Sequence, residues 1–279
     1  MNPNPLTIGY SPCPNDTYIF HALAHGLIDT PCVFAEPVLA DVEELNLRAM
    51  REELDVTKLS FHALAHLLES YVLLSAGAAL GRGCGPLLVS RRENQDLAGL
   101  KKIAIPGAYT TAALLLGLYL PGKVTTVVMR FDRIMDAVAS GAVDGGVIIH
   151  EGRFTYQEQG LVCLQDLGQW WEETTGFPIP LGCIVAHKRL GMDCIKEVDR
   201  AVRASLLHMR EHPHAGQDYI RAHAQEMDET VLASHINLYV NDFSLDLGDE
   251  GIDAVRELLR LGRERGLFTG STELTWVRA

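Results

Sequence analysis

The segment VDGGVIIHEGRFTY, from Val143 to Tyr156, constrains the fold more than any other part of this chain. An apolar run with two isoleucines stops at His150, and Glu151 and Arg153 follow directly. Such a run is typical of a buried strand in an α/β sheet with a polar residue at its carboxyl end. Open α/β sheets bind ligands outside those ends, so His150 is the first candidate for chemistry. A lone histidine there is more often satisfied by one structural hydrogen bond.

Three further segments repeat this pattern of an apolar strand followed by polar residues and a helix. The strands are expected at 6–10, 56–60 and 101–105, and their polar ends lie at 10–16, 58–60 and 106–111. Free backbone N–H groups at a helix N-terminus can bind an anion or hydroxyl groups. Thr110 and Thr111 are equally well explained as helix N-cap residues. With His150, four polar strand ends would face one cleft.

The rest of the chain alternates between strand and helix patterns up to Asp193 and is mostly helical after it. Further strands are expected at 32–38, 71–75, 85–90, 124–130, 142–149, 161–164 and 181–186. Helices are expected at 17–26, 41–54, 61–68, 112–119, 132–140, 194–211, 215–225, 229–240 and 249–265. The cap of the first helix is expected at Asn15, Asp16 or Thr17.

This order predicts an α/β protein of two lobes with two crossings between them and a helical C-terminal segment. The first, larger lobe would comprise residues 1–92 and 184–279, and the second residues 93–183. Extended segments near 85–90 and 181–186 would join the lobes. A cleft between two lobes is a frequent site for small molecules. The residues themselves therefore indicate a protein that binds a small polar ligand in a cleft.

Composition excludes several classes of protein. The net charge of −12 argues against nucleic acid as a partner, because phosphate binding needs a basic face. No apolar run approaches the ~18 residues of a membrane span, and the first residues do not resemble a secretory signal. Six scattered cysteines fit reduced thiols of a cytoplasmic protein and no zinc ligand spacing. His208 and His212 are four residues apart without a third ligand, so no metal site is expected.

Several motifs closely resemble those of the 1,4-dihydroxy-6-naphthoate synthase family, which acts in the futalosine route of menaquinone biosynthesis. They are SPCPNDT at 11–17, TKLS at 57–60, GRGCGPL at 81–87, TTA at 110–112 and IIHEGRFTY at 148–156. PLG at 180–182 and YVNDFS at 239–244 are also similar, and all occur in the same order over most of the chain. Tyr18 and Gly152 depart from the family pattern and leave its polar positions intact.

The resemblance implies a periplasmic-binding-protein-like (type 2) fold that serves as an enzyme in the cytoplasm. The substrate would be cyclic dehypoxanthine futalosine, cleaved by a lyase to 1,4-dihydroxy-6-naphthoate without a metal or an organic cofactor. His150 matches the proposed proton acceptor of the family. The segments that contact substrate match Lys58, Leu59, Ser60, Thr110 and Thr111, and we extend the cleft to Ser11, Asn15, Asp16, Arg82 and Arg153. For the two arginines, surface or interlobe ion pairs are the alternative.

Two other functions remain open at this point. One is a solute-binding protein of the same architecture that performs no chemistry, in which His150 would only hydrogen-bond the ligand. The other is the related chorismate dehydratase of the same pathway. The sequence also leaves open whether the chain forms a homodimer, which residue binds the substrate carboxylate, and whether Asp16 or Glu151 serves as a general acid.

Overall fold

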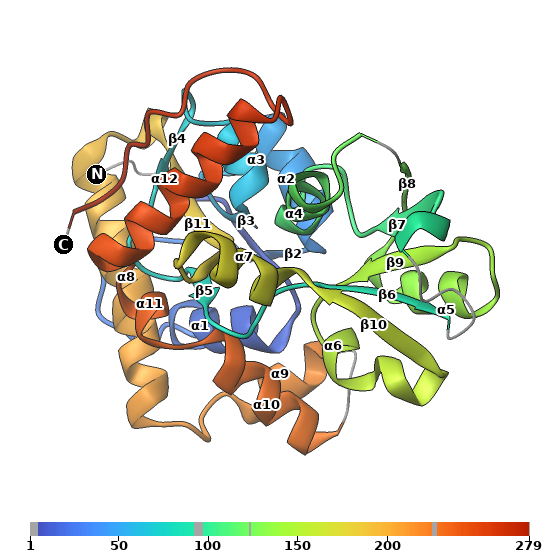
Figure 1. Cartoon of the computed structure of the whole chain (residues 1–279). Coiled ribbons are helices and arrows are strands. Elements are labelled where there is room, and N and C mark those ends of the chain that lie inside the picture. The colour runs from blue at the N-terminus through green and yellow to red at the C-terminus, as the bar shows by residue number, and fades with distance from the viewer. Residues whose placement is uncertain (1–4, 92–96, 123, 225–227, 279) are drawn as a thin grey trace.

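The computed structural model describes residues 5–91, 97–122, 124–224 and 228–278, and it contains two β-sheets that lie side by side (Figure 1). The first sheet has the order β2-β1-β3-β11-β4, with β5 paired to β11. Its strands are β1 (Ile8–Tyr10), β2 (Val38–Leu39), β3 (Val56–Ser60), β4 (Tyr71–Leu73), β5 (Ala79–Gly81) and β11 (Ile179–His187). β1, β2 and β3 are parallel, whereas β11 runs antiparallel to its neighbours.

The second sheet has the order β10-β6-β9-β7-β8. Its strands are β6 (Leu87–Arg91), β7 (Lys102–Ile105), β8 (Thr125–Val128), β9 (Gly145–Ile148) and β10 (Leu161–Asp166). β7, β8 and β9 are parallel, and β6 pairs antiparallel with both β9 and β10. The carboxyl ends of the parallel strands of each sheet are therefore the edges where the sequence expects polar side chains.

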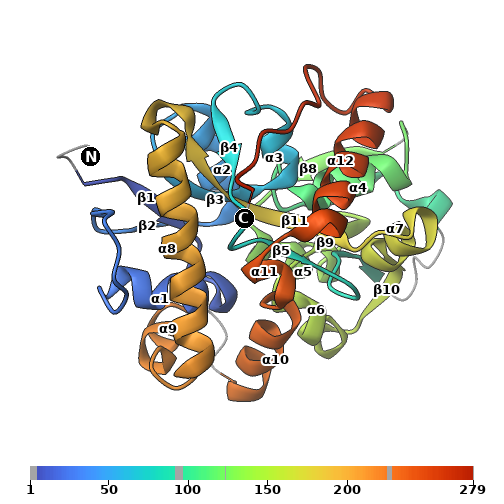
Figure 2. The ribbon, with the colours of Figure 1, turned by 90° about the vertical axis from the view of Figure 1, so that its left-hand side faces the viewer.

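Helices cover both sheets and form most of the C-terminal part (Figure 2). In the described residues they are α1 (Pro14–Ala24), α2 (Val42–Met50), α3 (Phe61–Ala65), α4 (Thr111–Tyr119), α5 (Ile134–Ala139), α6 (Gly152–Thr155), α7 (Leu167–Thr175), α8 (Met192–Glu211), α9 (Gln217–His223), α10 (Glu229–Tyr239), α11 (Asp242–Leu245) and α12 (Gly248–Glu264). α1 packs against α8, α9 and α10, and α12 packs against β11, α3 and α4. The C-terminal helices thus return to the first sheet.

The chain passes from the first sheet to the second between β5 and β6, and returns between α7 and β11. The expected lobe boundary at 92/93 lies outside the described residues. The division into lobes of 1–92 with 184–279 and of 93–183 stays a prediction. One apolar cluster includes Leu59 of the first sheet, Val147 of the second sheet and Trp171 of α7, so it joins the two sheets. Each sheet also packs against a cluster of its own, which includes Ile8 in the first sheet and Val89 in the second.

Several expected elements are wrong or misplaced. Residues 32–38 do not form a strand, because only Phe34 makes a bridge, to Leu6, before the short β2. Pro31 and Pro37 cannot donate to a strand ladder, which explains the interruption. Helix α1 begins at Pro14 with Cys13 as its N-cap, so the expected cap at 15–17 is wrong. Proline suits the first helical position because its fixed φ is already helical and its missing N–H is not needed there.

Three of the described helices were not expected from the sequence, namely α6, α7 and α11. α7 includes the Trp170–Trp171 pair, and its N-cap is Asp166, whose carboxylate accepts hydrogen bonds from the amides of Gly168 and Gln169. α11 lies in the segment expected to be a loop between the last two helices. Within the described residues, no helix combines the length and apolar character that a membrane span requires.

Candidate functional site

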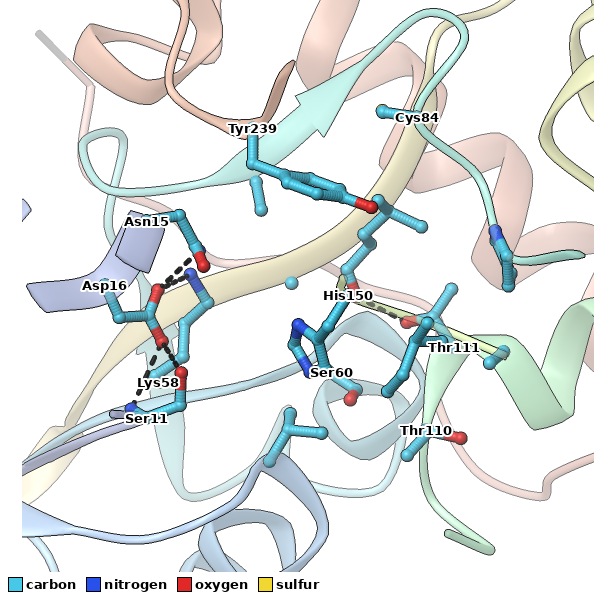
Figure 3. A pocket seen from close by; sticks show the side chains of 17 residues that line it. Ser11, Asn15, Asp16, Lys58, Ser60, Cys84, Thr110, Thr111, His150 and Tyr239 are labelled. Carbon is cyan, nitrogen blue, oxygen red and sulfur yellow. Dashed lines mark hydrogen bonds and ion pairs between the residues drawn. The ribbon is translucent and has the colours of Figure 1, made fainter. Parts of the chain in front are cut away.

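All four polar strand ends line one cavity between the two sheets (Figure 3). The cavity contains about 660 Å³ of empty space, part of it open to solvent. The expected site residues in its wall are Ser11, Asn15, Asp16, Lys58, Ser60, Thr110, Thr111 and His150. The expectation that these strand ends share one cleft is therefore confirmed, while the role of each residue stays a prediction.

His150 stands just beyond the carboxyl end of β9 and has a left-handed backbone, with φ of 56°. Positive φ is uncommon for residues other than glycine and is worth examining for function. Its Nε2 lies 3.9 Å from Cys13 Sγ, and its ring meets the edge of Phe131 with centroids 5.0 Å apart. Burial lowers the pKa of His150 below its usual value of 6.5, and the Glu151 carboxylate opposes part of that effect. The imidazole is therefore neutral at neutral pH.

A buried ion pair forms the cavity wall on the side of the first sheet. Lys58 Nζ lies 2.7 Å from Asp16 Oδ1, and both side chains are almost fully buried. Asp16 also accepts hydrogen bonds from the Ser11 hydroxyl at 2.7 Å and from Asn15 Nδ2 at 2.8 Å. A carboxylate with this many donors is held in one orientation. The ammonium of Lys58 has three donors, so it retains capacity for a ligand in the cavity.

The wall contributed by α4 contains both threonines. Thr110 is the N-cap of α4, because its hydroxyl oxygen accepts from the Ala113 amide at 3.2 Å. The Thr111 hydroxyl donates to the Leu181 carbonyl at 2.6 Å, which ties α4 to β11. The N-cap explanation is thus confirmed for Thr110, whereas Thr111 is not an N-cap and its hydroxyl links α4 to β11 instead. The backbone amides of Thr111 and Ala112 are the first of the helix and have no acceptor within it, so they can serve an anionic ligand.

Three expected site residues lie away from the cavity wall. The side chain of Leu59 is fully buried in the common core, because alternate residues of β3 face opposite sides. Arg82 is exposed and pairs with Glu250 at 2.9 Å. Arg153 pairs with Asp166 at 2.6 Å and donates to the Gly85 carbonyl. Both arginines make the ion pairs that were their alternative interpretation.

The cavity also has residues that the sequence did not mark as site candidates. Tyr239 of α10 and Cys84 of the β5–β6 loop also lie in its wall (Figure 3). His235, four residues before Tyr239, is fully buried and donates from Nε2 to Asn15 Oδ1 at 3.0 Å. The i, i+4 spacing of His235 and Tyr239 places both on one helix face, and this spacing was the available signal.

In the ranges 5–91, 97–122, 124–224 and 228–278, no group of three or more His, Cys, Asp or Glu side chains is arranged to hold a metal ion. The cavity wall instead offers one neutral imidazole, one ammonium paired with a carboxylate, several hydroxyls and a helix N-terminus. These groups can orient a polyhydroxylated or carboxylated molecule and accept a proton from it.

Comparisons with known proteins show which family this chain belongs to. A family model described as "Menaquinone biosynthesis" matches residues 6–264. The chain is 52% identical over 272 residues to a 1,4-dihydroxy-6-naphthoate synthase of Thermus thermophilus, covering 98% of this chain and 99% of the relative. It is 47% identical over 273 residues to a synthase of the same name from Streptomyces coelicolor, covering 96% of each.

Solved structures show the same fold. A protein from Archaeoglobus fulgidus superposes with a TM-score of 0.89 at 34% identity, covering 96% of this chain and all of that one. The alkanesulfonate-binding protein of Xanthomonas axonopodis bound to MOPS superposes with a TM-score of 0.71 at 15% identity over both full lengths. The periplasmic-binding-protein-like fold expected from the sequence motifs is confirmed. The chain belongs to the menaquinone-biosynthesis family that includes the 1,4-dihydroxy-6-naphthoate synthases, and it is an enzyme of that family.

Proposed function

We propose that this enzyme is a lyase that converts cyclic dehypoxanthine futalosine to 1,4-dihydroxy-6-naphthoate in the cytoplasm. The observation that supports this most directly is His150, a neutral imidazole in the cavity wall at the end of β9. A base of this kind works near neutral pH because it is unprotonated there and its conjugate acid can return the proton. Relatives that are about half identical over nearly their whole length have the name of this activity.

The proposed reaction starts when His150 accepts a proton from a carbon of the sugar-derived ring. The electron pair of that C–H bond forms a new double bond, and the carbon–carbon bond to the bicyclic ring breaks. The pair from the broken bond enters the ring system, which becomes the aromatic dihydroxynaphthoate. His150 then returns its proton to the products, so the step needs no oxidant or other reactant. Aromatisation supplies the driving force.

The remaining wall residues are proposed to orient the substrate. Lys58 has ammonium donors beyond the one it gives to Asp16, and the Ser60 hydroxyl, which accepts from Asn46 at 3.3 Å, is free to donate. The amides of Thr111 and Ala112 at the start of α4 would bind the substrate carboxylate, because a helix N-terminus favours negative charge. These donors would offset the negative charge of the substrate locally, in a protein whose net charge is −12.

Turnover of cyclic dehypoxanthine futalosine, followed by chromatography of the naphthoate product, tests the proposal. The informative variant is His150→Asn, because asparagine tolerates the left-handed backbone of this position better than alanine does. We expect wild type to form product and His150→Asn to lose at least ~10²-fold in kcat. His208→Asn on α8, away from the cavity, is the matched control.

Each other outcome has a definite meaning. Equal turnover by wild type and His150→Asn would remove the proton-acceptor role from His150 while keeping the activity. A folded wild-type protein that binds the substrate tightly without forming product would instead act as a solute-binding protein. Dehydration of chorismate in place of naphthoate formation would assign the chain to the other lyase of the pathway.

A further inference from the structure

His235 on α10 contacts both halves of the cavity although it does not line it. Its side chain is fully buried, and it comes from the C-terminal helical segment. On one side its Nε2 lies 3.0 Å from Asn15 Oδ1. On the other side its ring lies nearly parallel to that of His150, with an interplanar angle of 17° and centroids 6.0 Å apart. One residue therefore touches the wall formed by α1 and the turn that follows β9.

The hydrogen-bond partners of Asn15 show which atom donates and which accepts in the contact between Asn15 and His235. Asn15 Nδ2 donates to Asp16 Oδ1, which can only accept, so Asn15 Oδ1 is the free acceptor of that amide. His235 must then donate from Nε2, and its Nδ1 has no proton when the ring is neutral. Burial lowers the pKa of His235 well below 6.5, and the neighbouring His150, when it is protonated, and the Lys58 ammonium lower it further, so the ring is neutral.

The surroundings of Nδ1 agree with a neutral ring. Nδ1 is buried without a hydrogen-bond partner in the part of the chain that the structure describes. The Glu151 carboxylate stands 3.9 Å away, which is beyond hydrogen-bond distance. The contact to Asn15 is thus the one hydrogen bond of this imidazole among the described residues, and the other contribution of the ring is the surface that it presents to His150.

We propose that His235 is a positioning residue with two separable roles: its Nε2–H holds Asn15 against Asp16, and its neutral ring excludes water from one face of His150. The first role orders the wall that contains the Lys58–Asp16 pair, and so serves substrate binding. The second role limits the contact of the His150 ring with water, which favours its neutral form, and so serves proton transfer. The kinetic part of this proposal rests on the proposed function, whereas its spectroscopic part does not.

Two variants separate the roles. His235→Gln places an amide donor where Nε2 stood, so it keeps the hydrogen bond to Asn15 and loses the ring. His235→Phe keeps a ring of similar width beside His150 and leaves Asn15 Oδ1 without its donor. His21→Gln is the matched control, because His21 is also a buried histidine with an unpartnered nitrogen in the described structure, and it lies on α1 away from the cavity wall.

The first measurement is the titration of His150 by NMR in ¹⁵N-histidine-labelled protein without ligand. Burial is the largest cause of its lowered pKa, so water admitted by His235→Gln should raise that pKa toward 6.5. We expect a rise of at least about half a pH unit in His235→Gln, and less than about 0.2 in His235→Phe and His21→Gln. The other groups that act on this titration are Glu151, Asp16, Lys58 and Asp41, and none of them is changed. An unchanged titration in His235→Gln would overturn the water-exclusion role.

The second measurement is steady-state kinetics with cyclic dehypoxanthine futalosine between pH 5 and 8. His235→Phe should raise KM at least ~5-fold with kcat within about twofold, because it disturbs a binding wall and leaves the base covered. His235→Gln should keep KM within about twofold and move the acid limb of kcat/KM to higher pH, parallel to the NMR result. If both variants instead lower kcat and raise KM to a similar extent, His235 has only a structural role. Absence of turnover in wild type would refute the proposed function, and the NMR result would still decide the water-exclusion role.

Discussion

The buried pair of Lys58 and Asp16 is a residue-scale feature with a large expected effect on stability. Both side chains are at most 5% exposed, and Asp16 also accepts from Ser11 and Asn15. Removing one member of a buried pair costs about 3–5 kcal/mol, because the other charge stays buried without compensation. Asp16→Asn should therefore lower the free energy of unfolding by about 3–5 kcal/mol in urea denaturation.

The chain supplies a matched control for this prediction. Arg82 and Glu250 also form a charged pair, but both side chains are about half exposed. Glu250→Gln should change the free energy of unfolding by less than about 1 kcal/mol, because water screens an exposed pair. Equal effects of Asp16→Asn and Glu250→Gln would mean that water in the cavity already solvates Lys58.

At the scale of elements, a contact between two glycines sets how closely α7 approaches the β5–β6 loop. A Cβ added to Gly85 would lie 2.3 Å from the Cα of Gly168, which is backbone and cannot rotate away. Arg153 bridges the same place through Asp166 and the Gly85 carbonyl. Gly85→Ala should therefore lower the free energy of unfolding by about 1–3 kcal/mol, the usual cost of overpacking.

The free energies of unfolding of Gly85→Ala and Gly99→Ala, measured by thermal or urea unfolding, test this prediction. Gly99 has no atom within 4 Å of an added Cβ, and its backbone does not need glycine, so its substitution adds a methyl group without a clash. If Gly85→Ala is as stable as Gly99→Ala, then α7 and the β5–β6 loop can move apart at little cost in free energy.

The elements also show what the sequence could and could not predict. Polar residues after apolar runs correctly indicated the four segments of the cavity wall, because strand ends and helix starts are local patterns. The direction of Leu59 and the partners of Arg153 depend on tertiary contacts, so the sequence did not separate them from true wall residues. His235 was missed because its neighbours Asn15 and His150 are 220 and 85 positions away.

At the scale of the whole molecule, buried histidines make the fold sensitive to acid. His62 of α3 is nearly fully buried, and its Nδ1 lies 3.2 Å from the Thr110 carbonyl at the start of α4. Burial is the main cause that lowers the pKa of His62 to about 4. The pKa values of His21 and His235 are lowered for the same reason. In each case the folded chain binds fewer protons than the unfolded chain below pH 6.5.

The sign of the resulting pH dependence follows directly. Above pH 6.5 His62 is neutral in both states and has no effect on stability. Between pH 6.5 and about 4 only the unfolded chain takes up the proton, so stability falls as the pH falls, by about 3 kcal/mol for His62 alone.

Urea unfolding of wild type and His62→Gln at pH 7 and pH 4 measures this difference. We expect the acid-induced loss to be smaller by about 3 kcal/mol in His62→Gln and unchanged in His208→Gln, whose side chain is partly exposed on α8. The same loss in all three proteins would mean that His62 is already protonated in the folded chain near pH 6.5, and that the core behind α4 admits water.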